Sequence, residues 1–151
     1  MTETDAWSRA VAAVTADLLG EGRRIHDVSR LLTFAAGLGL IVGIVSPRAL
    51  VPVLAAGLAA LLGLVETYLA IRVGFDAALF DRLSGRTAAL PDLEALDGAL
   101  TSLGLIEGGT ADRPIAARAA GARRLLAWQG RALAVQVAIL VAGAFAAWGL
   151  A

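Results

Sequence analysis

The sequence contains no cysteine and no lysine, and its single histidine is His26. Without cysteine the chain cannot form disulfide bonds, thiolate nucleophiles or thiolate metal sites. One histidine is too few to build a histidine metal site. We therefore expect neither a metal nor a cofactor.

Motifs of catalysis and of nucleic-acid binding are also missing. No nucleophile stands in an elbow motif, and no phosphate-binding glycine motif follows a strand pattern, so we expect a protein that is not an enzyme. The thirteen basic residues are balanced by thirteen acidic ones, and acidic residues accompany the arginines of the middle of the chain. This balance argues against a nucleic-acid partner.

Charge itself is scarce, because only 17% of the residues are charged while 58% are hydrophobic, and mean hydropathy is +0.75. Three runs carry no charge at all: Leu31–Val45, Ala49–Val65 and Ala132–Ala151. Extended to Ile71, the second run forms a helix of about 34 Å, enough to cross a hydrocarbon core of roughly 30 Å. The sequence predicts an all-α integral membrane protein with three transmembrane helices.

The runs divide the chain into four parts. Only Ser46, Pro47 and Arg48 separate the first two runs, which predicts a helical hairpin; a re-entrant hairpin that does not cross the bilayer is the alternative. The expected parts are an amphipathic helix over 1–22, a transmembrane hairpin over 23–73 with spans at about 29–46 and 49–72, a cytosolic helical region over 74–130, and a C-terminal transmembrane helix over 131–151.

Two apolar stripes lie outside the spans. Trp7, Val11, Val14 and Leu18 recur at helical spacing; this face lies on the headgroup layer or in a partner's groove, or it packs on the protein's own helices. The second stripe covers the helix before it or docks a partner, and it consists of Leu93, Leu96, Leu100 and Leu103.

The arginines predict the orientation. Of the thirteen, only Arg48 lies between the first two spans. The positive-inside rule then places the N-terminus and the middle region in the cytoplasm and the C-terminus outside. We expect a multi-pass protein of a bacterial inner membrane.

Three polar residues fall inside the predicted spans. If Arg30, Arg72 and Arg131 all mark the inner boundary, these residues lie about 4 to 9 Å inside it at a similar depth. The predicted intramembrane polar layer is Thr33, Glu66 and Gln136.

An acidic residue within a span is a candidate functional site. Glu66 has three interpretations: a structural hydrogen bond to Thr33 or Gln136, a pair with a group of another subunit, or a proton or cation relay. By contrast, His26 beside Asp27 suggests only a solvated pair at the interface.

Small residues mark the faces on which helices approach closely. Two of them share the face of Glu66, and the others form a pair in each of the remaining spans. The predicted packing residues are Ala59 and Gly63, Gly39 and Gly43, and Gly143 and Ala147.

Arg124, Trp128 and Arg131 share one face where the last helix enters the predicted membrane. They are a candidate seat for anionic lipid headgroups, or they are ordinary flanking charges of a span.

These features favour a small non-enzymatic accessory or scaffold subunit that packs with a larger membrane complex and presents its helical cytosolic unit. Besides membrane lipids, its expected partners are other membrane subunits or further copies of the chain. The alternative is a homo-oligomeric transporter or channel in which Glu66 of each protomer lines the pathway.

Overall fold

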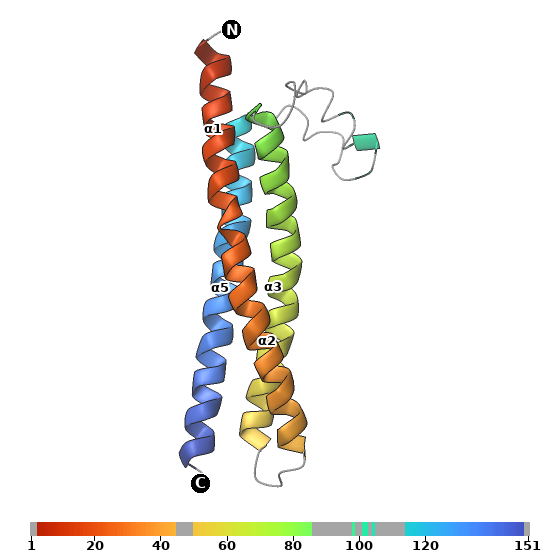
Figure 1. Cartoon of the computed structure of the whole chain (residues 1–151), viewed down its shortest axis with the longest axis vertical. Helices are drawn as coiled ribbons and strands as arrows, with labels where there is room; N and C mark the ends of the chain where they lie inside the picture. The colour runs from red at the N-terminus through yellow and green to blue at the C-terminus, as the bar shows by residue number, and fades with distance from the viewer. Residues whose placement is uncertain are drawn as a thin grey trace. The chain divides into compact units, whose positions relative to one another are not determined.

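The computed structural model describes residues 3–44, 50–85, 98, 101–102, 104 and 114–149, and within these ranges it is helical and contains no strand. The main elements are α1 (Glu3–Gly20), α2 (Gly22–Ile44), α3 (Leu50–Leu83) and α5 (Ile115–Gly149) (Figure 1). Three stretches are long and apolar enough to cross a membrane: Ala6–Gly43, Leu50–Leu83 and Ile115–Trp148. The predicted all-α class and its three apolar helices are confirmed. The four leucines of the second predicted stripe lie outside the described residues.

The helix ends follow local chemistry. The amide of Ser84 donates to the carbonyl of Phe80 at 2.9 Å, and Gly85, with φ of 75°, ends α3 in the left-handed conformation that glycine adopts without strain. Pro114 directly precedes α5, and its carbonyl accepts from the amide of Ala117 at 2.9 Å. As the sequence predicted, α3 continues past Arg72 for about three turns, and α5 runs without a break into the last apolar segment.

The chain forms two compact units. The first contains Met1–Gly20 and Val73–Arg124. Its buried residues include Ala12, Leu19 and Phe80, while Trp7, Val14 and Leu18 are 56%, 68% and 42% exposed. Within the described residues most of this stripe is therefore exposed, and only Val11 is half-buried. Alanines next to the stripe take the buried positions, because small side chains let helices approach more closely.

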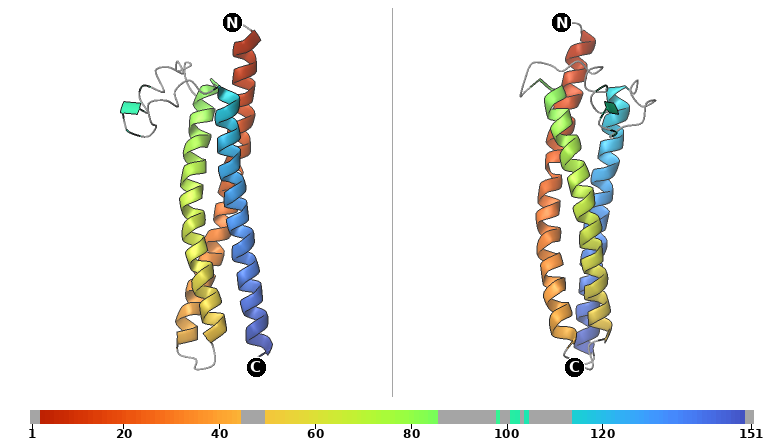
Figure 2. Two further views of the ribbon diagram at one scale, coloured as in Figure 1. Left: turned by 180° about the vertical axis from the view of Figure 1, so that it is seen from behind. Right: turned by 90° about the vertical axis from the view of Figure 1, so that its right-hand side faces the viewer.

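The second unit contains Glu21–Arg72 and Leu125–Ala151. Within it α2, the first part of α3 and the second part of α5 lie side by side (Figures 1 and 2). Buried positions recur every seven residues, the period with which supercoiled helices keep one seam together. They are Ser29 and Ala36 on α2, Ala59 and Glu66 on α3, and Gln129, Gln136 and Gly143 on α5.

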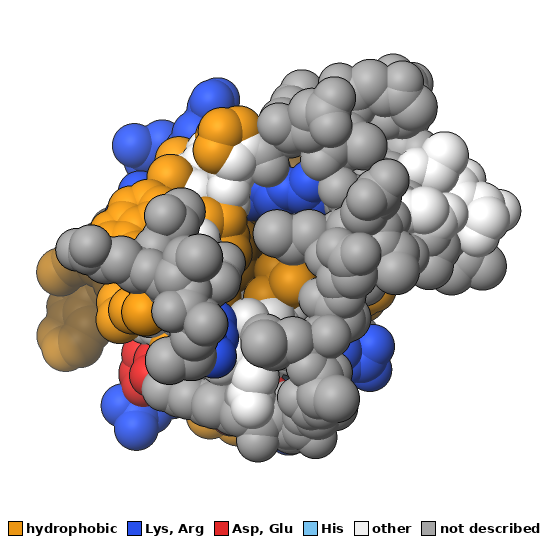
Figure 3. Space-filling view, turned by 90° about the horizontal axis from the view of Figure 1, so that it is seen from above, with side chains coloured by type: hydrophobic (Ala, Val, Ile, Leu, Met, Phe, Trp, Pro, Cys, Tyr) orange, Lys and Arg blue, Asp and Glu red, His pale blue; other side chains and the backbone are white. Residues whose placement is uncertain are grey.

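The second unit has its large apolar side chains on the outside. Leu38, Leu61 and Phe145, one from each helix, are 65%, 61% and 75% exposed. In a view along the helices, apolar side chains form part of the outer surface of the molecule beside projecting arginines (Figure 3). An interior of small and polar residues under an apolar exterior is the reverse of a water-soluble bundle.

Candidate functional site: a polar network among three apolar helices

Small residues bring the three helices of the second unit close together. Ala36, Ala56 and Ala59 form a buried apolar cluster. A Cβ added at Gly63 would collide with the hydroxyl of Thr33, and one added at Gly143 would lie 2.6 Å from the Cβ of Ala55. At these two positions only glycine permits the observed approach.

Gln136 of α5 is the centre of a first set of hydrogen bonds. Its Oε1 accepts from the hydroxyl of Ser29 at 2.8 Å, and its Nε2 donates to Thr33 Oγ1 at 3.0 Å and to the carbonyl of Ala59 at 3.2 Å. Gln136 is fully buried. Because its amide bonds to residues of α2 and of α3, it joins all three helices. We call this set, formed by Ser29, Thr33, Gln136 and the carbonyl of Ala59, the amide layer.

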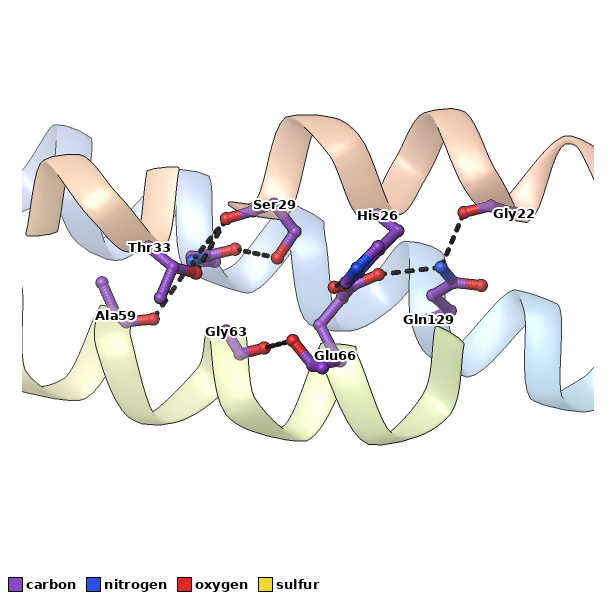
Figure 4. A network of polar contacts seen from close by, with 10 residues as sticks. Gly22, His26, Ser29, Thr33, Ala59, Gly63, Glu66 and Gln129 are labelled. Carbon is purple, nitrogen blue, oxygen red and sulfur yellow. Dashed lines mark hydrogen bonds and ion pairs between the residues drawn. The ribbon is translucent and has the colours of Figure 1, made fainter. Parts of the chain in front are cut away.

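Glu66 of α3 is the centre of a second set (Figure 4). Its Oε1 accepts from Gln129 Nε2 at 2.8 Å, and its Oε2 lies 2.9 Å from His26 Nδ1. Gln129 Nε2 also donates to the carbonyl of Gly22 at 2.8 Å. Glu66 and Gln129 are fully buried, whereas the side chain of His26 keeps 23% of its exposure. We call His26, Glu66, Gln129 and the carbonyl of Gly22 the carboxylate layer.

The partners expected for Glu66 are therefore wrong. Thr33 and Gln136 bond to each other, while Glu66 bonds to His26 and Gln129 in a separate layer. Gln129 and Gln136 are seven residues apart on α5, about 10 Å along a helix, so the two layers stack along one seam. The seven-residue spacing of the two glutamines was the pattern in the sequence from which this layer was predictable.

The expectation that His26 forms a solvated pair with Asp27 is also wrong. Its imidazole turns away from solvent toward the carboxylate of Glu66. His26, Ser29 and Thr33 are spaced three and four residues apart, so they share one face of α2. That shared face carries His26 into the bundle.

Of the two polar atoms of the Gln129 amide, only the nitrogen has hydrogen-bond partners among the described residues. Its nitrogen has two acceptors, which fixes the orientation of the amide, but its buried Oε1 has no hydrogen-bond partner among the described residues. Those residues also contain no group of three acidic or histidine side chains that could hold a metal ion. Among the described residues, these buried side chains thus provide hydrogen bonds between the helices.

The three arginines expected at one boundary lie at two heights. Arg72 lies six residues from the carboxylate layer along α3, or about 9 Å. Arg30 lies four residues from the same layer on α2 and Arg131 two residues on α5, about 6 and 3 Å in the opposite direction because α3 runs antiparallel to both. The common boundary on which the predicted depths rested is therefore wrong.

The predicted packing residues differ in how far they are buried. Ala59 and Gly63 are buried, as is Gly143. Gly39 is exposed, although a Cβ there would meet the Cβ of Ala56 at 3.7 Å, and Gly43 is half-buried. Ala147 is exposed too, and within the described residues α5 closes on its neighbours through Gly143.

The proposed lipid residues lie on the surface of α5. Arg124 and Arg131 are exposed and Trp128 is 54% exposed. The guanidinium of Arg131 stacks on the ring of Trp128, with its carbon 5.2 Å from the ring centre. This cation–π contact holds the charge of Arg131 one turn toward the N-terminus of α5.

Comparison of the chain with family models, with curated proteins and with solved structures finds no match. Its function is therefore inferred from its own residues.

We expect a substitution in the amide layer to have a moderate effect on the stability of the bundle. We expect Gln136→Leu to lower the free energy of unfolding in mixed micelles by about 1 to 2 kcal/mol, because bonds between membrane helices contribute little each. The matched control is Val135→Leu at a neighbouring half-exposed position of α5. Equal stability of the two variants would show that Gln136 does not hold the helices together.

Proposed function

We propose that this chain is a small non-enzymatic accessory or scaffold subunit of a bacterial inner membrane. In this proposal its three apolar helices cross the bilayer, the N-terminus and the region 74–130 lie in the cytoplasm, and the C-terminus lies outside. The helical cytosolic part is presented to a larger membrane complex. The orientation is supported by the arginines, of which only Arg48 falls between the first two helices.

The observation that carries the proposal is the use made of the buried polar groups. Both carboxylate oxygens of Glu66 are taken by partners within the same chain, and the amide of Gln136 is bonded to the two other helices. Groups used in this way stabilise a bundle. Glu66 is fully buried within the chain, which argues against a pair with a group of another subunit.

The transporter alternative has weaker support. A relay across the membrane needs polar groups or water along the whole path. Beyond the amide layer, the described core of the second unit consists of Ala36, Ala56 and Ala59, with Leu40 and Ile139 packed against them. The polar groups thus line only one part of the bundle, and an apolar part follows.

The first test is the composition of the particle in a mild detergent. We expect the tagged chain to migrate on native gels with other polypeptides at a fixed ratio, and to fall to the size of one chain, 15.4 kDa, in a harsh detergent. A particle built only from copies of this chain would contradict the accessory role.

The second test separates the two functions directly. In liposomes that contain only this chain and a pH-sensitive dye, we expect no proton flux above that of protein-free liposomes, and the same result for Glu66→Gln. Flux in the native chain that Glu66→Gln abolishes would overturn the proposal and establish the alternative.

A further inference from the structure

Exposed aromatic and cationic side chains gather at one height of the second unit. Trp128 on α5 is one residue from the carboxylate layer and Tyr68 on α3 is two residues from it, so their backbones lie within about 2 Å of one height. Trp128 is 54% and Tyr68 62% exposed. Aromatic residues with one polar end prefer the boundary between hydrocarbon and headgroups.

Two cations reach the same height. Side chains of a helix lean toward its N-terminus, which for Arg30 on α2 and Arg131 on α5 is the direction from the amide layer toward the carboxylate layer. The stacking of Arg131 on Trp128 shows this lean. Neither arginine has an ion-pair partner given by the described residues, although Asp27 lies three residues before Arg30 on α2.

A second aromatic residue marks the far end of the unit. Trp148 is 86% exposed and follows Trp128 by twenty residues of the same helix. Twenty residues of helix span about 30 Å, the thickness of a bilayer's hydrocarbon core. Between these heights the exposed side chains of the described residues include Phe34, Leu54 and Val141, and the charged ones are Asp27, beside the carboxylate layer, and the two leaning arginines.

From these observations we infer that phospholipid headgroups of the inner leaflet contact a belt formed by Arg30, Tyr68, Trp128 and Arg131. The carboxylate layer then lies at the headgroup boundary, and the amide layer lies about 10 Å inside the hydrocarbon. Arg72 stands in the cytoplasm, about 9 Å beyond the carboxylate layer. This inference rests on the proposed membrane location and fixes the height of the bundle in the bilayer.

The absence of cysteine makes a direct test possible, because each introduced thiol is the only one in the chain. Three exposed positions of α3 are used: Tyr68→Cys at the belt, Leu61→Cys about 10 Å deeper, and Leu54→Cys near the middle. A membrane-impermeant maleimide is added to inside-out vesicles, and a sample denatured in detergent gives the full labelling of each thiol. We expect labelling at Tyr68→Cys and loss of labelling at Leu61→Cys and Leu54→Cys.

The outcomes separate the inference from the proposal on which it rests. Protection of all three thiols would mean that the boundary lies farther out, near Arg72, and would overturn the inference while the membrane location stands. Labelling of Leu54→Cys together with Tyr68→Cys would overturn the membrane location itself. Labelling of Tyr68→Cys only in right-side-out vesicles would reverse the proposed orientation and so exclude the inner leaflet.

Discussion

Gly63→Ala is expected to lower the free energy of unfolding by about 1 to 3 kcal/mol, the usual cost of overpacking a tight core. A Cβ at this position would collide with the hydroxyl of Thr33 on the neighbouring helix. Alanine is the better helix former by about 0.5 to 1 kcal/mol, so the collision must exceed that gain. Unfolding by sodium dodecyl sulfate in mixed micelles measures the difference.

A second variant and a control make the result specific. Thr33→Ala removes the colliding hydroxyl, so in the Thr33→Ala background we expect Gly63→Ala to be much less damaging. The control is Gly57→Ala on the same helix, where a Cβ would meet Leu40 Cδ2 at an ordinary 3.7 Å. We expect Gly57→Ala to be neutral or stabilising. Equal losses at the two glycines would show that helix contact is not the cause.

The sequence was sufficient to predict elements that depend on local patterns. Uncharged runs predicted the three apolar helices, and Ser84 with Gly85 predicted the end of α3, because hydropathy and chain stereochemistry act over short distances. Gly63 was predicted as a packing residue because small residues on the face of an acidic one are typical of close helix contact.

Which side chains meet across two helices depends on the heights of these helices relative to each other. A single sequence does not give these heights. Heights were estimated from arginines, as if each marked the same boundary, and this estimate paired Glu66 with Thr33 and Gln136. Arg72 lies six residues from the carboxylate layer, on the side opposite to Arg30 and Arg131. This difference in height is enough to give Glu66 two other partners than those predicted. His26 was missed because its neighbour Asp27 suggested a solvated pair, whereas the face that it shares with Ser29 carries it inward.

Glu66→Ala is expected to be the most damaging substitution in the carboxylate layer. It leaves His26 Nδ1 without its partner and Gln129 Nε2 with the carbonyl of Gly22 alone, and it opens a cavity where a fully buried side chain stood. Removal of one member of a buried pair costs about 3 to 5 kcal/mol, and the 23% exposure of His26 lets solvent replace part of the loss. We therefore expect a decrease in the free energy of unfolding of about 2 to 4 kcal/mol.

Glu66→Gln distinguishes the hydrogen bonds of this residue from its charge. The amide oxygen still accepts from Gln129, and the amide nitrogen faces His26 Nδ1, which accepts a hydrogen bond in one neutral tautomer. If the layer acts through hydrogen bonds, Glu66→Gln lowers the free energy of unfolding by only about 1 kcal/mol and Glu66→Ala by several times more. A Glu66→Gln variant as unstable as Glu66→Ala would show that an amide does not replace the carboxylate in this layer, because both variants lose the Oε2 oxygen that faces His26.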